Sequence, residues 1–138
     1  MLAWAILQHH GWLTSDVINQ RDLNAAAKVR LLLGWAGVST MLPADGFDAL
    51  KARSRGLPKD WGGPEILFNV RNKLVHPPKK LAGAEWPSSG EMVESWRLAG
   101  CYLELVVLRV LGYEGEYWSR LRRLDRYGAD VEAVPWRC

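Results

Sequence analysis

The sequence predicts an all-α fold, in which four to five helices form a bundle around one long, apolar central helix. Two segments, 22–33 and 89–111, are rich in helix-forming residues and carry apolar side chains at helical spacing. A third segment, 65–75, lies between prolines that fit a helix start and a helix end. With 138 residues, the chain is long enough for a hydrophobic core, so we expect a single helical domain over 1–138.

The first two helices are predicted in the N-terminal quarter of the chain. A short helix covers 2–9 and is followed by a glycine. The second helix covers 22–33, and its apolar face includes Leu23, Ala27 and Leu31. Gly34 and Gly37 weaken the end of this helix, because glycine loses more conformational entropy on folding than other residues.

Two further helices are predicted in the middle of the chain. Asp45 is the expected N-cap of a short helix over 47–52, since its carboxylate can accept an unpaired N–H of the first turn. Pro64 suits the first position of the helix that follows, where its missing N–H has no partner in any case. Pro77 crowds the backbone of His76 and disfavours helical geometry there, so His76 lies at or just past the helix end.

The longest helix is predicted to begin with a capping box. Ser88 and Glu91 have the required spacing, because the hydroxyl and the carboxylate can each accept one unpaired backbone N–H. Between residues 98 and 111 the only charged residues are Glu104 and Arg109. A helix on the surface of a monomer normally has a wider polar face. We therefore expect this helix to be buried on most sides, either as the centre of the domain or with one face against a second copy.

The C-terminal part of the chain carries weaker signals. The arginines of segment 120–126 form a basic stretch, which we interpret as a polar helix face with local ion pairs. Residues 131–136 alternate as a strand does, but the segment is too short and isolated to assign.

The composition bounds the class of protein. The net charge of +3 permits a polyanionic partner without requiring one. No apolar run is long enough for a membrane span, and no basic signal-peptide region precedes the first apolar residues. Cys101 and Cys138 fit neither a disulfide framework nor a zinc site, so we expect a cytoplasmic protein without metal or cofactor. Because the chain starts within a helical pattern, we interpret it as a domain of a longer protein.

Arg71, Asn72 and His76 are the candidate catalytic residues. RNA can be cleaved by its own 2′-hydroxyl when one group takes the 2′-proton, another protonates the leaving 5′-oxygen, and a cation stabilises the phosphorane. Histidine suits the proton transfers, because its unperturbed pKa is about 6.5. Arginine suits the phosphorane, because its planar fork stays charged and can bind two oxygens. Asn72 would orient either the imidazole or the phosphate.

The spacing of these residues needs the proline. On a regular helix, residues five apart lie about 140° apart around the axis and about 7.5 Å apart along it. Once His76 leaves helical geometry, its ring can turn toward the Arg71 side and share a phosphate with it. Two alternatives remain open. Arg71 can instead form an ion pair with a carboxylate such as Glu65, and His76 can be a cation that favours the C-terminal end of a helix.

The stretch Arg71-Asn72-Lys73-Leu74-Val75-His76-Pro77, followed by the long apolar helix from Trp96 to Gly112 and then Tyr113, resembles the HEPN superfamily (higher eukaryotes and prokaryotes nucleotide-binding). More narrowly, it is similar to the Apea-like HEPN domains of bacterial proteins. The Arg-x4-His element of that family corresponds to Arg71 and His76, and its polar residue after the arginine corresponds to Asn72. The similarity covers most of the chain, from about residue 22 to residue 126.

This resemblance implies a helical bundle that forms a homodimer, in which two Arg–His pairs meet in a cleft. Many such domains are metal-independent endoribonucleases of bacterial toxin, defence or RNA-processing systems. Others are inactive and serve as dimerisation or binding modules. Apea-like domains often lie at the C-terminal end of larger proteins, so other domains of a longer chain are expected partners as well.

The lead hypothesis is therefore an RNA-binding endoribonuclease domain that acts as a homodimer. Lys73, Lys79 and Lys80 flank His76 and are the candidate RNA-binding residues, since lysines can hold phosphates on either side of a scissile bond. As an alternative, each lysine is an ordinary solvated side chain. The second hypothesis is a non-catalytic helical module that dimerises or docks a partner, which the nearly uncharged face of the long helix favours.

Overall fold

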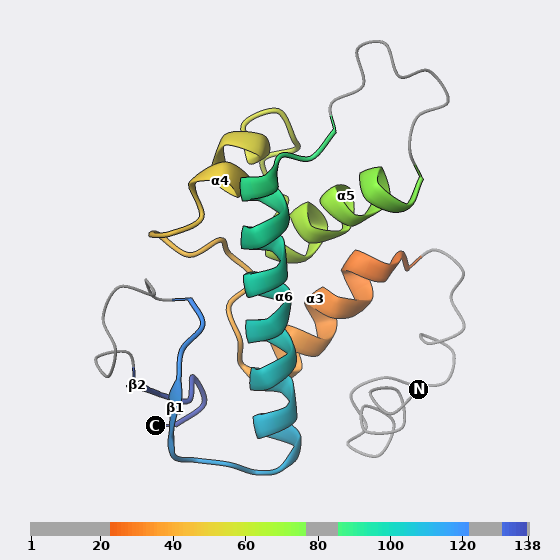
Figure 1. The fold of residues 1–138 in the computed structure, drawn as a ribbon. Helices are drawn as coiled ribbons and strands as arrows, with labels where there is room; N and C mark the ends of the chain where they lie inside the picture. The colour runs from red at the N-terminus through yellow and green to blue at the C-terminus, as the bar shows by residue number, and fades with distance from the viewer. Residues whose placement is uncertain (1–22, 77–85, 122–130, 138) are drawn as a thin grey trace.

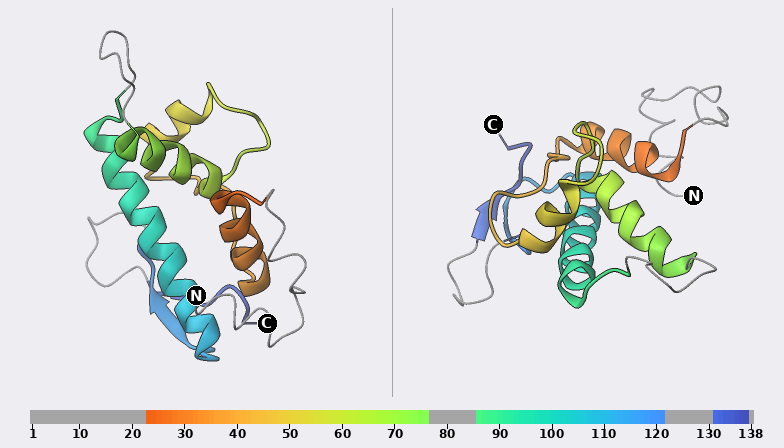
Figure 2. Two further views of the ribbon diagram at one scale, coloured as in Figure 1. Left: turned by 90° about the vertical axis from the view of Figure 1, so that its right-hand side faces the viewer. Right: turned by 90° about the horizontal axis from the view of Figure 1, so that it is seen from above.

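The computed structural model describes residues 23–76, 86–121 and 131–137, and these form four helices and a two-stranded antiparallel sheet. The longest helix runs through the middle of this part of the chain (Figure 1). Two helices, α3 and α5, lie on one side of it, and α4 and the sheet lie on the other (Figures 1 and 2). The predicted helical fold is thereby confirmed. The elements are α3 (Ala25–Ala36), α4 (Asp48–Ser54), α5 (Gly63–Val75), α6 (Ser89–Val110), β1 (Glu116–Trp118) and β2 (Val131–Ala133).

The hydrophobic core lies where α6 meets the other helices. Its largest fully buried side chains come from several elements of the chain, and they include Leu33, Phe47, Leu50, Ile66, Val70 and Leu98. Complete burial of one such side chain contributes about 1.5–3 kcal/mol. The expected burial of α6 is found on the face that carries Leu98, Cys101 and Leu105, whereas Trp96, Leu103 and Val107 are exposed. Cover of these exposed side chains by a second copy stays a prediction.

Helix α3 begins and ends about three residues later than predicted. Asn24 caps its start, where the side-chain oxygen accepts the N–H of Ala27 at 2.8 Å. Gly34 lies inside the helix, and the end comes at Gly37, whose φ of 72° is in the left-handed region that favours glycine. The burial of Leu33 and Ala36 outweighs the cost of about 1 kcal/mol that Gly34 imposes on the helix.

The predicted N-cap of α4 is wrong. Phe47, not Asp45, occupies the N-cap position, and the Phe47 side chain cannot make a capping hydrogen bond. Instead, the carboxylate of Glu94 on α6 accepts the N–H groups of Ala49 at 3.1 Å and Leu50 at 2.8 Å. A carboxylate from a distant part of the chain thus satisfies this helix start, and local sequence could not reveal it.

The start of α5 depends on two glycines. A Cβ atom at Gly62 would strike the carbonyl oxygen of Thr40, and one at Gly63 would strike the phenol oxygen of Tyr102. The Gly63 N–H donates to the Thr40 carbonyl at 2.6 Å. Only glycine permits this close approach, so the pair anchors the beginning of α5 against the rest of the domain. Pro64 lies in the first turn, as predicted.

The capping box at the start of α6 is confirmed. The Glu91 N–H donates to the Ser88 hydroxyl oxygen at 3.2 Å, and the Ser88 N–H donates to the Glu91 carboxylate at 2.6 Å. The same carboxylate accepts a hydrogen bond from Nη1 of Arg53 on α4 at 2.6 Å. These bonds fix the start of α6 against α4, so one acidic residue both caps its own helix and joins two helices.

The C-terminal segment forms a small sheet that packs beside α6. Residues Val131–Ala133 pair antiparallel with Glu116–Trp118, in a register that places Glu116 opposite Ala133. The alternation seen in the sequence of 131–136 therefore corresponds to a strand, whereas no strand was predicted at β1. Arg120 pairs with Glu104 at 2.6 Å, so the ion pairing expected for the basic stretch is found at its first arginine.

Several predicted features fall outside the described residues. They are the helix over 2–9, the segment 77–85 with Pro77, the arginines at 122, 123 and 126, and Cys138. Within the described ranges, Cys101 is buried, and this burial raises the pKa of its thiol to about 12. None of the helices in the same ranges has the length and apolar character needed to cross a bilayer.

Candidate functional site

A solvent-open hollow of about 530 Å³ lies between α5 and the N-terminal end of α3. Four of the six predicted site residues line it, namely Arg71, Asn72, Lys73 and His76. The remaining wall comes from α3, from the loop before α5 and from earlier turns of α5. These lining residues are Asn24, Ala25, Ala26, Trp61, Glu65, Phe68 and Asn69.

Helix α5 presents one face to this hollow. Glu65, Asn69, Asn72 and His76 follow one another at intervals of three and four residues, which keeps them on one side of a helix. Phe68 and Arg71 lie at the edge of that face, and both also line a second, apolar hollow. The candidate catalytic residues therefore occupy the last turns of α5, where the helix ends.

His76 has left helical geometry, as the following proline predicted. It is the C-cap of α5, with φ of −121° and ψ of 71°, and its N–H donates to the Asn72 carbonyl at 2.8 Å. This is the i→i−4 bond of a helix, so the Cα of His76 still follows the last turn of α5, and the chain departs from the helix after it. Both His76 and Arg71 line the same hollow and are exposed to solvent.

Asn72 contacts the guanidinium group of Arg71. The Nη1 atom of Arg71 donates to the side-chain oxygen of Asn72 at 3.1 Å. Among the described residues, Arg71 forms no ion pair with a carboxylate. An arginine whose charge has no carboxylate partner can bind an anionic ligand without first breaking an ion pair.

Glu65, which sequence analysis considered as a partner of Arg71, instead pairs with Arg30 of α3. Both carboxylate oxygens accept guanidinium N–H groups of Arg30 at 2.7 Å, and the Gly62 N–H donates to the same carboxylate at 2.9 Å. Burial raises the pKa of Glu65, but these hydrogen bonds lower it by more, so the pKa lies below its ordinary value. The negative charge in the wall of the hollow is thus matched by Arg30.

Replacing Glu65 with Gln is expected to lower the free energy of unfolding by about 1 kcal/mol near pH 7, because a bidentate pair is lost while Arg30 is partly exposed. The native pKa of Glu65 lies below the unfolded value, so its contribution is present above the unfolded pKa and is lost as the pH falls through the native pKa. Urea unfolding near pH 7 and near pH 3 measures both values. The exposed Glu114→Gln variant is the control. An equal difference from wild type at both pH values would contradict the assigned charge pair.

The structure describes one of the three lysines that were predicted to bind RNA. Lys73 lines the hollow. Lys79 and Lys80 lie outside the described residues. Sequence analysis did not select Trp61, Phe68, Asn24 or Asn69 as site residues. The sequence offers one signal, its eight tryptophans, but tryptophan is more often a packing residue than a platform for stacking bases, so the number does not single out Trp61. In the part of the chain that the structure describes, no three His, Cys, Asp or Glu side chains gather as metal ligands would.

A second, apolar hollow of about 690 Å³ lies between α3, α5 and α6, and we call it the apolar groove. Arg71 and Phe68 line both the apolar groove and the hollow that holds His76. Ser95 and Tyr102 of α6 line the groove. The other α6 residues that line it recur at intervals of four and three, which is the spacing of a helix seam that packs against another helix. They are Met92, Trp96, Ala99, Leu103 and Val106.

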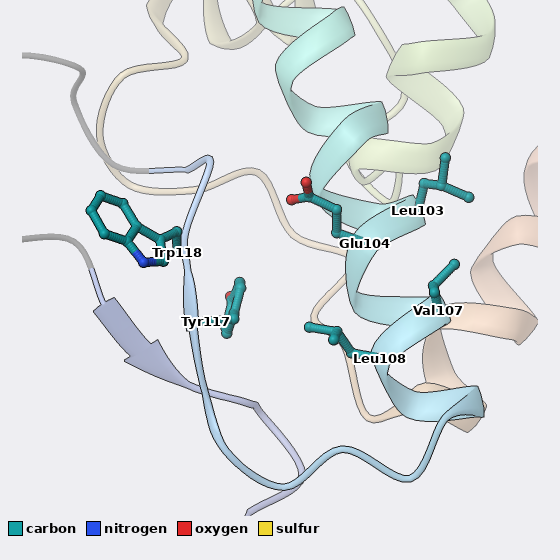
Figure 3. A pocket seen from close by; sticks show the side chains of 6 residues that line it. All are labelled: Leu103, Glu104, Val107, Leu108, Tyr117 and Trp118. Carbon is teal, nitrogen blue, oxygen red and sulfur yellow. The ribbon is translucent and has the colours of Figure 1, made fainter.

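A third hollow, of about 450 Å³, lies between α6 and β1 (Figure 3). In Figure 3, Glu104, Leu108 and Tyr117 lie between the helix and the strand, while Leu103 and Val107 project from another side of α6. Glu104 is held there by Arg120. No predicted site residue lines this hollow, so it has no part in the candidate site.

Comparison with known proteins assigns the chain to a family. Residues 1–132 match the family model of the YopA C-terminal domain. The chain is also similar to the SPbeta prophage-derived uncharacterized protein YopA of Bacillus subtilis (strain 168), with 31% identity over 142 residues. That alignment covers 99% of this chain and 28% of the relative, so the chain spans little more than a quarter of that protein. No solved structure matches this chain. The chain therefore belongs to the YopA C-terminal domain family.

Proposed function

We propose that this domain is a metal-independent endoribonuclease of the HEPN type, and that Arg71, Asn72 and His76 form its active site. The observation that carries the proposal is the shared hollow. Within residues 23–76, 86–121 and 131–137, the Arg71 guanidinium makes no ion pair with a carboxylate, and it lines one solvent-open surface together with the imidazole of His76. The arrangement supports RNA cleavage, because a phosphate that binds Arg71 would lie within the same hollow as a group able to move protons.

Each of the three residues has a separate role in this reaction. His76 takes the 2′-proton, which lets the 2′-oxygen attack the adjacent phosphorus. Arg71 donates hydrogen bonds to the phosphorane oxygens as their negative charge grows. Asn72 positions the guanidinium through the hydrogen bond to Arg71 Nη1. The second proton transfer, to the leaving 5′-oxygen, would use the His76 imidazole of a second copy.

The apolar groove supports a homodimer as the active form. Its surface is almost wholly apolar, and several of its α6 side chains are exposed, which is unusual for a monomer. Arg71 lines both this groove and the catalytic hollow. A second copy that covers the groove would therefore reach the edge of the catalytic hollow, where its own Arg71 and His76 can widen the site.

Cleavage of RNA in the presence of EDTA tests the proposal. The chain is expected to cut single-stranded RNA and to leave 2′,3′-cyclic phosphate and 5′-hydroxyl ends, because the 2′-oxygen is the nucleophile. End-specific labelling and mass spectrometry of the fragments identify these ends. Intact RNA after incubation with folded protein, or fragments with 5′-phosphate ends, would contradict the proposal.

A second candidate function is a non-catalytic helical module that dimerises or docks a partner. The apolar groove favours it, since such a surface needs no catalytic residue. The two functions differ in what they require of the hollow, because the module has no need of Arg71 and His76.

The relative's name assigns that protein to a prophage. Toxin and defence nucleases act in the setting of phage infection, and we extend the nuclease proposal to that setting.

A further inference from the structure

We propose that the hollow beside Arg71 and His76 binds one unpaired base of single-stranded RNA, stacked on Trp61 and Phe68. This inference rests on the proposed nuclease function, and it names the substrate class of the same site. Its basis is a juxtaposition: two partly exposed aromatic side chains line the hollow that also holds the cation and the imidazole.

The aromatic side chains come from two different elements. Trp61 belongs to the loop before α5, and Phe68 belongs to the second turn of α5. Phe68 and Arg71 are three residues apart, so on a helix their side chains are neighbours. An aromatic ring and a phosphate-binding guanidinium at this separation match the two parts of a nucleotide, its base and its phosphate.

The backbone at Trp61 is held in place by two close contacts with neighbouring segments. The backbone N–H of Trp61 donates to the Pro58 carbonyl at 3.1 Å, which closes a turn. Gly62 follows directly, and it lies so close to Thr40 that no larger residue fits. The backbone that carries the indole is therefore fixed at the start of α5 before any ligand binds, which reduces the conformational entropy lost on stacking.

The polar groups of the hollow suit the edge of a base. Asn24 and Asn69 line it, and the side-chain oxygen of each already accepts a hydrogen bond, from Ala27 N–H and from Arg53 Nε. No described residue accepts a hydrogen bond from either amide nitrogen, so both can donate to carbonyl or ring-nitrogen acceptors of a base. Glu65 does not repel the RNA strongly, since its carboxylate is paired with Arg30.

Duplex RNA does not fit this description. In a duplex the faces of each base are covered by neighbouring bases, and a protein reaches only their edges, the 2′-hydroxyls and the phosphates. A concave site with aromatic walls needs a base that has left the stack. The volume of about 530 Å³ is within the range of small-molecule sites and is large enough for one nucleotide.

The test uses a short fluorescein-labelled 2′-O-methyl RNA, which lacks the attacking hydroxyl and stays intact. Fluorescence anisotropy measures its affinity for the 138-residue chain, as a single strand and as a duplex. Trp61→Leu is expected to weaken single-strand binding about tenfold or more, because the stacking of one base is lost. Duplex affinity should stay unchanged. Trp61→Phe retains a ring and should retain most of the affinity.

The control is Trp118→Leu, which removes an exposed tryptophan that does not line the hollow and should leave single-strand affinity unchanged. Phe68→Leu provides a second, independent loss of a stacking ring. Thermal melting confirms that each variant is folded. Wild-type affinity for the single strand in both Trp61→Leu and Phe68→Leu would overturn the inference, as would an equal loss on the duplex.

Failure of this inference is distinguishable from failure of the nuclease proposal. If Trp61→Leu and Phe68→Leu both bind the single strand normally while wild-type protein cleaves RNA in EDTA, the base site is wrong and the nuclease stands. If Trp61→Leu loses affinity while wild-type protein cleaves nothing, the base site stands on a non-catalytic RNA-binding domain.

Discussion

His76→Ala is expected to slow RNA cleavage by about 10²- to 10⁴-fold, the usual loss when a general acid or base is removed. Arg71→Ala is expected to cost about 10²- to 10³-fold, because the phosphorane loses a preorganised charged donor. Both side chains are exposed at the end of α5, so neither change removes core packing. Initial rates of cleavage in EDTA, with thermal melting of each variant, measure the two effects separately from stability.

Two further variants make this test specific. Arg71→Lys keeps the charge but loses the planar fork, so it should recover only part of the rate. Arg55→Ala removes an exposed arginine at the C-cap of α4, outside the hollow, and should cleave at the wild-type rate. If Arg71→Ala and Arg55→Ala cleave alike, the activity depends on general positive charge and the assigned role of Arg71 is wrong.

The parts of the fold that sequence predicted best are those specified by neighbouring residues. The capping box of Ser88 and Glu91 and the departure of His76 before Pro77 both depend on contacts within a few residues, and both are found. The start of α4 depends on Glu94, which is more than forty residues away, so the choice of Asp45 was wrong. Gly34 was given too much weight, because burial of the flanking residues was not visible from local pattern.

The same distinction applies to the candidate site. Arg71, Asn72 and His76 are close in sequence, and their shared hollow follows from one helix end. Trp61 reaches that hollow through the close contacts of Gly62 and Gly63 with Thr40 and Tyr102, which no short pattern encodes. The pairing of Glu65 with Arg30 spans thirty-five residues, and it removes the carboxylate that sequence analysis considered as a partner of Arg71. Long-range pairs thus determine which nearby groups remain available to a ligand.

Leu103→Glu is expected to convert a homodimer into a monomer, with the dissociation constant raised at least about 100-fold. Leu103 is 66% exposed and lines the apolar groove, so it can face a second copy while contributing little to the core of its own chain. In the dimer its replacement would bury a charge without a partner, which is far more costly than the loss of one apolar contact. Light scattering after size exclusion measures the mass directly.

Cleavage by the same variant connects the groove to catalysis. If the second copy completes the site beside Arg71, the Leu103→Glu monomer should lose most of its activity although Arg71 and His76 are intact. Met41→Glu places the same charge at a residue that is 72% exposed and outside the groove, so it should stay dimeric and active. A wild-type chain that is monomeric at concentrations where it cleaves RNA would exclude the dimer cleft, since one copy of the hollow would then suffice.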